Sequence, residues 1–237
     1  MLSTLTCFYA GLITLALASI PALAQQVHLP DAPKPYTTVS NTSPRIKKSG
    51  WSNAVQPGEK SQPLSIKEKL LFPIHEELLP LSWFSTFFSS GWEQLTDSDP
   101  RYGVDSGAYG QRLGAAVVRG FNMRVFSDGA LPALLHEDPR YYRKAHGSIV
   151  HRGLYAALRV FVGQRDSGVS VFNTSVVVGH GMASALTMAY YPDKSSNTAV
   201  VFKTWGFSLL GEAGGNLWLE FWPDAHERLF RRHHSDE

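Results

Sequence analysis

Cysteine is nearly absent from this chain of 237 residues, since Cys7 is the only one. It lies in an N-terminal segment that we expect to be removed, so the mature protein would have no disulfide and no cysteine metal ligand. Familiar catalytic patterns are missing as well. The sequence has no Gly-x-Ser-x-Gly turn, no glycine-rich phosphate loop and no His-Glu-x-x-His pair. We therefore expect no metal site and no cofactor.

Charged side chains are absent from residues 1–24, which have an apolar centre and end in Pro21-Ala22-Leu23-Ala24. This pattern predicts a secretory signal peptide that is cleaved after Ala24. The alternative is an uncleaved anchor, because an uncharged run of about 20 residues can span a bilayer. The proline and the small residues after it favour cleavage. We expect an exported protein, located in the periplasm or in a membrane of the cell envelope.

Large apolar residues are scarce in residues 25–63, which contain six prolines. This composition predicts a disordered linker. The linker has five basic and two acidic side chains, hence a charge of +3, whereas the whole chain has +2. The domain from 64 to 237 is therefore close to neutral, at −1. Because nucleic-acid binding requires a clustered positive face, this balance argues against a nucleic acid as the partner.

Strand-type alternation is absent from residues 64–237, where apolar residues recur at helical spacing. The spacing predicts an all-α bundle of five to six helices. A capping box at Ser65-Ile66-Lys67-Glu68 opens the first helix. Further helices are expected at 105–126, 148–162, 173–191 and 196–221, with a short terminal helix after Pro223.

Small residues recur at packing intervals in these expected helices. Interior glycine costs a helix about 1 kcal/mol relative to alanine, so repeated glycine indicates close approach of another backbone. Such seams are typical of helices in membranes, but they also occur in tightly packed soluble bundles and between subunits. The sequence therefore leaves an oligomer open. The three seams are Gly107-Gly110-Gly114-Val117-Phe121, Gly181-Ala185-Ala189 and Gly206-Leu210-Gly214-Leu217-Phe221.

A charge-free aromatic segment follows the first expected helix. It includes Trp83, Phe84, Phe87 and Phe88, and this composition fits a segment that lies in the plane of a membrane interface. The next helices carry arginines, and a charge costs about 2.5 to 3.5 kcal/mol at a bilayer centre. We therefore expect a bundle that rests on a membrane or is partly sunk into it, with these four aromatic residues in contact with lipid.

A short sequence repeat suggests an internal duplication. Asp99-Pro100-Arg101-Tyr102 recurs letter for letter at Asp138-Pro139-Arg140-Tyr141, and each copy precedes a helix with two arginines seven residues apart. The proline ends the preceding helix, and the aspartate can accept hydrogen bonds from the turn. This pattern predicts two related helical hairpins, 99–137 and 138–192.

The densest polar cluster lies around residue 140. His136, Glu137 and Asp138 are candidate catalytic acids or bases, and Arg140 and Arg143 are candidate anchors for a phosphate or carboxylate. The alternative, which we favour, is a helix end whose charges pair locally.

His180 lies between two glycines in an apolar helix, where it could be a buried base. A core histidine satisfied by a neighbour is the favoured interpretation.

A polar stripe follows the fifth expected helix, with Ser208, Glu212, Asn216 and Glu220 four residues apart. If this stripe is buried, it requires cationic partners from the neighbouring helices. We predict that Glu212 is buried together with at least one arginine. The candidate arginines are Arg112, Arg119, Arg152 and Arg159, and we include Glu212, Arg112 and Arg159 among the candidate binding residues.

Four motifs together resemble those of a family of exported bacterial envelope proteins. They are His136–Arg143, Arg165–Gly168, Phe172-Asn173 and Tyr190-Tyr191-Pro192, and the resemblance covers residues 92 to 230. No activity is established for that family, so the resemblance implies an envelope location and assigns no functional residue.

Two functions remain open from the sequence. The first, which is favoured, is a non-catalytic helical protein that handles lipid or another envelope component. The second is an envelope hydrolase that uses the cluster of His136, Glu137 and Asp138. Since no catalytic motif is recognised, the sequence leaves open whether the protein is an enzyme.

Overall fold

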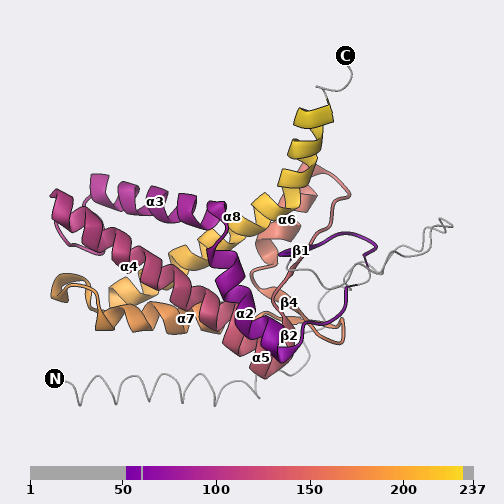
Figure 1. The fold of residues 1–237 in the computed structure, drawn as a ribbon, viewed down its shortest axis with the longest axis horizontal. Helices are drawn as coiled ribbons and strands as arrows, with labels where there is room; N and C mark the ends of the chain where they lie inside the picture. The colour runs from indigo at the N-terminus through magenta and orange to yellow at the C-terminus, as the bar shows by residue number, and fades with distance from the viewer. Residues whose placement is uncertain (1–51, 60, 232–237) are drawn as a thin grey trace.

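A computed structural model describes residues 52–59 and 61–231 of the chain. This part is mostly helical, with a little β-structure gathered at one end (Figure 1). The expected all-α class is therefore confirmed in its coarse form. The predicted signal peptide and most of the predicted linker lie outside the described residues.

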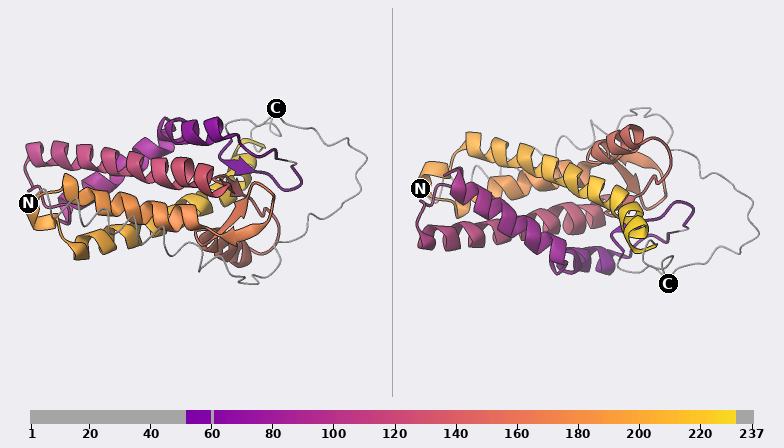
Figure 2. Two further views of the ribbon diagram at one scale, coloured as in Figure 1. Left: turned by 90° about the horizontal axis from the view of Figure 1, so that it is seen from below. Right: turned by 90° about the horizontal axis from the view of Figure 1, so that it is seen from above.

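The longer helices are α2 (Ile66–Glu77), α3 (Pro80–Leu95), α4 (Ser106–Arg124), α6 (Ile149–Leu158), α7 (Thr174–Leu186) and α8 (Thr198–Arg231). A π-helical turn, Val125–Ala130, continues α4 and leads directly into the short helix α5 (Leu131–Leu135). Two 3₁₀ turns, Thr187–Ala189 and Asp193–Ser195, join α7 to α8. Helix α3 packs on α4, and α8 packs on α7 and α6. Figure 2 shows the long helices side by side, with α6 and the strands at one end.

Helix starts follow the expected capping chemistry. The Ser65 hydroxyl accepts a hydrogen bond from the Glu68 amide, and the Glu68 carboxylate accepts one from the Ser65 amide, so the predicted capping box is confirmed. The side chains of Asp105, Ser148 and Asn173 each accept one hydrogen bond from an amide in the first turn of α4, α6 and α7, without a reciprocal bond.

Two small sheets were not expected from the sequence. Strand β1 (Ala54–Val55) pairs in parallel with β3 (Tyr141–Tyr142). Strands β2 (Glu137–Asp138), β4 (Val162–Arg165) and β5 (Ser170–Phe172) form an antiparallel sheet in the order β2-β4-β5. Val55 is buried, so residues just after position 51, which we assigned to the linker, pack against the domain.

The two predicted hairpins differ in structure. Helix α4 has 19 residues and continues into the π-helical turn, whereas α6 has 10 residues and is followed by strands β4 and β5. Their first turns also differ, since the Asp99–Pro100 peptide bond is cis. The duplication remains a prediction based on the sequence.

The predicted helix break at Pro223 is wrong, because α8 continues through it to Arg231. A proline inside a helix has no N–H, so the carbonyl four residues earlier, here that of Leu219, loses its amide partner. Here the carbonyl oxygen of Glu220 accepts hydrogen bonds from the side chains of Arg143 and Arg152, both at 2.9 Å. Arg143 lies directly after β3 and Arg152 lies on α6, so these bonds attach α8 to the rest of the fold just before the proline.

The predicted small-residue seams are less tightly packed than expected. On α7 the closest approach is at Gly179, outside the predicted seam, where a Cβ atom would lie 2.8 Å from the backbone nitrogen of Ser127 in the π-helical turn, whereas a Cβ at Gly181 would make an ordinary contact of 3.5 Å with the Trp205 ring. By contrast, a Cβ at Gly110, Gly114, Gly206 or Gly214 would meet no atom within 4 Å. The prediction of tight helix contacts is therefore wrong for these four glycines, which border open space.

Many large apolar side chains remain exposed on α2, α3, α6 and α8. Among residues 52–59 and 61–231, however, no helix combines the length and apolar character needed to cross a membrane.

Candidate functional site

A cleft of about 1000 Å³ lies between α3 and α8, and residues of α4 and α7 line it as well. On α8 it extends from Lys203 to Leu219, about 24 Å of helix at 1.5 Å per residue. The Lys203 end lies beside Asp99, and the other end lies beside Tyr141 and Arg159. We call these the loop end and the sheet end.

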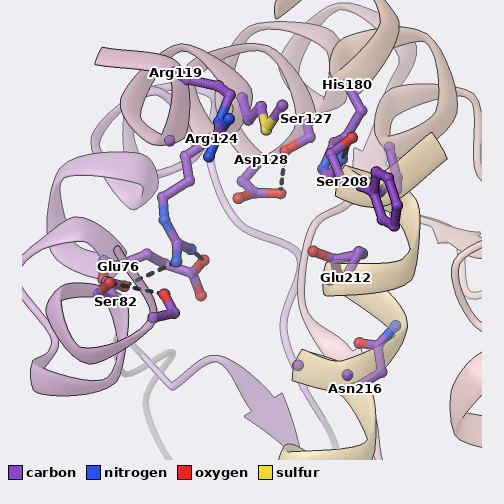
Figure 3. A pocket seen from close by; sticks show the side chains of 18 of the residues that line it. Glu76, Ser82, Arg119, Arg124, Ser127, Asp128, His180, Ser208, Glu212 and Asn216 are labelled. Carbon is purple, nitrogen blue, oxygen red and sulfur yellow. Dashed lines mark hydrogen bonds and ion pairs between the residues drawn. The ribbon is translucent and has the colours of Figure 1, made fainter. Parts of the chain in front are cut away.

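The rim of the cleft is aromatic and the floor is polar. Phe84, Phe88 and Trp92 of α3 line one side of the rim, and Phe207 and Trp218 of α8 line the other. All five are exposed to solvent. Open space beside Gly211, Gly214 and Gly215 widens the α8 side, because no atom lies within 4 Å of a Cβ built at any of them. The polar floor side chains include Arg124, Asp128, His180, Ser208 and Glu212 (Figure 3).

Glu76 and Arg124 form an ion pair in the floor. The guanidinium group of Arg124 also donates to Glu77 at 3.0 Å and to the Ser82 hydroxyl at 2.8 Å. All three of its nitrogen atoms are therefore used within the protein. Burial and the neighbouring Asp128 nevertheless raise the pKa of Glu76 to about 8.

Asp128 and Glu212 face the same space from opposite sides of the cleft (Figure 3). Asp128 accepts a hydrogen bond of 2.8 Å from the Ser127 hydroxyl, and burial together with Glu212 raises its pKa to about 6. Burial also raises the pKa of Glu212. Among the described residues, the Glu212 carboxyl group makes no hydrogen bond and no ion pair within 4 Å. The floor therefore has more carboxyl groups than cations.

His180 lies beside this group of carboxyls, with its Nδ1 atom 2.9 Å from the Ser208 hydroxyl oxygen. Ser208 donates its own proton to the Trp205 carbonyl at 2.7 Å, so His180 donates to Ser208. Burial lowers the pKa of His180, which keeps the imidazole neutral near pH 7. This arrangement satisfies a core histidine and does not activate Ser208 as a nucleophile.

The three other candidate catalytic residues are His136, Glu137 and Asp138. Their side chains do not converge on one possible substrate position. His136 is largely exposed, outside the cleft. Glu137 accepts a hydrogen bond from the Ser175 amide at the start of α7, and burial raises its pKa. Asp138 forms a buried ion pair of 2.6 Å with Arg140 and accepts a further bond from the Tyr142 hydroxyl at 2.8 Å.

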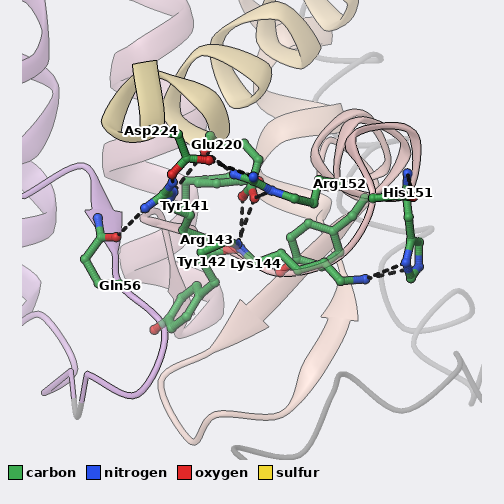
Figure 4. Close-up of polar contacts among 12 residues, drawn as sticks. Gln56, Tyr141, Tyr142, Arg143, Lys144, His151, Arg152, Glu220 and Asp224 are labelled. Atoms are coloured by element: carbon green, nitrogen blue, oxygen red, sulfur yellow. Dashed lines mark hydrogen bonds and ion pairs between the residues drawn. The ribbon is translucent and has the colours of Figure 1, made fainter. Parts of the chain in front are cut away.

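Three of the candidate arginines are used internally. Arg112 is fully buried and donates to the carbonyls of Pro100 and Gly103, both at 3.2 Å. Arg140 is paired with Asp138, as described above. Arg143 pairs with Asp224 and lies in a network on the far side of α8 (Figure 4).

That network contains the buried acid–arginine pair that the sequence suggested, but with a different glutamate. Glu220 is fully buried, and its Oε1 atom lies 2.7 Å from Nε of Arg152. Its carboxylate also accepts bonds from the Tyr141 hydroxyl and from the amides of Lys144 and Ala145. The prediction that Glu212 is the acid buried with one of these arginines is therefore wrong. The acid in the pair is Glu220, about two helical turns further along α8, and Glu212 lines the cleft instead.

The expected lipid-contacting residues are all exposed on α3. Their rings form two adjacent stripes, Trp83 with Phe87 and Phe84 with Phe88, with centroids 6.2 Å apart in each pair. Only the Phe84–Phe88 stripe lines the cleft. Within the described part of the chain, no group of histidine and acidic residues has the geometry of a metal site.

Sequence reasoning did not single out Asp128 or Glu76 as functional residues. A signal was present for Asp128, which follows the arginine-bearing helix in a Ser-Asp-Gly sequence, but that sequence predicts a turn. It forms part of the π-helical turn instead.

The chain matches no protein-family model, and comparisons with curated proteins and with solved structures also give no match.

Proposed function

We propose that the protein binds an amphiphile in the cleft, with the polar end of the ligand on the floor and its apolar part against the aromatic rim. The observation that carries this proposal is the division of one cavity into exposed rings at the rim and buried or half-buried charged groups below. Small-molecule sites typically have volumes of about 300 to 1000 Å³, so the cleft is large enough for a lipid headgroup and the first part of its chains.

Lipid is the amphiphile that we favour. The Trp83–Phe87 stripe extends the apolar surface of α3 beyond the cleft, next to the Phe84–Phe88 stripe at its rim. A contiguous apolar surface of this kind is typical of sites that meet membranes or partner proteins. The expected signal peptide supports an exported protein that meets lipid in the cell envelope. We therefore propose a membrane-associated, lipid-handling role.

A binding role is preferred to the hydrolase alternative because the acids of the His136–Asp138 cluster are already engaged. Both carboxylate oxygens of Asp138 accept hydrogen bonds from Arg140. A general acid or base needs access to its substrate.

Filling the cleft from the α8 side tests the proposal. Gly211 lines the cleft and Gly206 does not, yet both lie on α8 and neither has an atom within 4 Å of a built Cβ. Gly211→Leu should weaken the binding of a short-chain phospholipid about tenfold or more, measured by isothermal titration calorimetry. Gly206→Leu, the matched control, should leave it unchanged. Equal binding by both variants and the parent would contradict the proposal.

A further inference from the structure

Most of the charged side chains that line the cleft are paired with one another. Four ion pairs account for eight of them: Glu93–Arg119, Asp99–Lys203, Glu76–Arg124 and Asp138–Arg140. Glu137 is held by the amide of Ser175 at the start of α7. The charged groups that remain are Arg159, Asp128 and Glu212.

Arg159 is a buried cation without a counter-charge. It lies at the end of α6 and is only 9% exposed. Among the described residues, its guanidinium group has no carboxylate within 4 Å and makes no hydrogen bond. Its guanidinium group lies over the ring of Tyr142, whose centroid is 5.7 Å away, and it acts electrostatically on Tyr141 and Tyr155. Burying a charge without a compensating partner is unfavourable, so this site favours an anion supplied by a ligand.

Nearby acids do not supply that anion. Glu220 and Asp224 are matched by Arg143 and Arg152 (Figure 4). Asp138 is matched by Arg140. Glu137 lies at this end too, where it accepts a hydrogen bond from the Ser175 amide and, like Arg159, has no ion pair among the described residues. Arg159 is therefore the cation at the sheet end that no ion pair within 4 Å engages.

Asn216 adds a second unpartnered group at the same end. It is 6% exposed, it lines the cleft, and its side-chain amide makes no hydrogen bond with the described residues. The packing of α6 on α8 brings both residues to the sheet end of the cleft. Arg152 bonds Glu220 and Gly153 faces Leu217, so α6 continues toward Arg159 as α8 runs back toward Asn216.

The opposite charge lies one turn further along α8. Glu212 precedes Asn216 by four residues, which places the two side chains on one face of the helix (Figure 3). Across the cleft from Glu212 is Asp128, which has no cationic partner within 4 Å among the described residues. A cationic group at this point would separate the two carboxyls and pair with both of them. One cleft thus contains a cation at its sheet end and two acids further along α8, none of them in an ion pair among the described residues.

We propose that the cleft recognises a zwitterionic headgroup, with its phosphate on Arg159 and Asn216 and its ammonium group between Glu212 and Asp128. This inference rests on the proposed function and specifies its ligand. A phosphoethanolamine headgroup has the required charges and keeps N–H donors for both acids, whereas a phosphocholine headgroup has the charge but no N–H donor. A phosphoglycerol headgroup has only the anion.

The test compares water-soluble dihexanoyl lipids by isothermal titration calorimetry. The parent should bind dihexanoyl phosphatidylethanolamine about tenfold or more tightly than the phosphatidylglycerol analogue, because charge-assisted hydrogen bonds contribute about 1.5 to 3 kcal/mol. Glu212→Gln should remove most of this preference by weakening the ethanolamine lipid alone. Arg159→Gln should weaken both lipids about tenfold. Arg159→Lys should restore part of the affinity, which separates lost charge from lost folding.

Arg101→Gln is the matched control, because Arg101 is an exposed arginine outside the cleft. It should leave both affinities unchanged. Equal affinity of the parent for the two lipids, or an unchanged ratio in Glu212→Gln, would overturn the zwitterion inference and leave amphiphile binding intact. If no lipid binds, the proposed function fails as well. If free glycerophosphoethanolamine binds as tightly as the lipid, the aromatic rim contributes nothing and amphiphile binding is contradicted.

Discussion

Arg152 and Glu220 form a buried ion pair across the contact between α6 and α8, with Nε and Oε1 2.7 Å apart. Seven residues further along the chain, Arg159 is also buried but has no acid within 4 Å among the described residues. The same type of side chain therefore stabilises the fold at one position and remains available to a ligand at the other. This difference underlies both the stability and the binding predictions.

The first prediction compares Glu220 with Glu212. Glu220→Ala should lower the free energy of unfolding by about 3 to 5 kcal/mol, because it leaves Arg152 buried without its main partner. Glu212→Ala should change it by less than about 1 kcal/mol, because Glu212 has no ion pair to lose. Urea denaturation of both variants measures the difference. A larger loss in Glu212→Ala would show that the polar stripe stabilises α8 at the cleft.

The second prediction concerns close packing at Gly179. A Cβ atom at this position would lie 2.8 Å from a backbone nitrogen that cannot move freely. Gly179→Ala should therefore destabilise the protein by about 2 kcal/mol. Gly206→Ala, on open helix surface, should stabilise it by up to about 1 kcal/mol. Thermal midpoints that shift in the same direction for both variants would contradict this account of the α7 contact.

The third prediction is a pH dependence of stability. Burial raises the pKa of Asp128 from 3.8 to about 6. The folded state thus binds a proton more tightly, and this contribution is full below pH 3.8 and is lost as the pH rises through 6. The free energy of unfolding should therefore fall between pH 4 and 7. Asp128→Asn should reduce that fall by about 1 to 2 kcal/mol. Parallel pH profiles of parent and variant in urea denaturation would refute it.

The fourth prediction separates the two aromatic stripes of α3. Trp83→Ser with Phe87→Ser should reduce sedimentation with lipid vesicles, because these rings are exposed outside the cleft. It should leave the binding of a dihexanoyl lipid unchanged. Phe84→Ser with Phe88→Ser should reduce both, since these rings also form the rim. If the two double variants behave alike in both assays, the cleft and the membrane surface are not distinct.

Local patterns predicted much of the helical structure. The capping box at Ser65 and the starts of α4, α6 and α7 follow from side chains that bond the first turn of each helix. The strands could not be predicted from local patterns. Strands β1 and β3, for example, have two residues each and form only because two distant segments pair. The hydrogen bonds that the α8 backbone receives just before Pro223 likewise come from distant arginines, one directly after β3 and one on α6.

The site was only partly predictable for the same reason. The four-residue spacing on α8 identified Glu212, Asn216 and Glu220 as one stripe, but the rotation of α8 against α6 decides which of them is buried with an arginine. Arg159 was a candidate because it lies seven residues after Arg152 on a helix expected to pack against the polar stripe. Its lack of a counter-charge depends on where Glu220, Asp224 and Asp138 lie in three dimensions.

The most direct measurement of the central claim is a crystal structure with a short-chain phosphoethanolamine lipid brominated on its chains. The account predicts an anomalous bromine signal against Phe84, Phe88 and Phe207, with headgroup density between Arg159 and Glu212. Bromine signal found only on the outer face of α3, with no ligand density in the cleft, would contradict it.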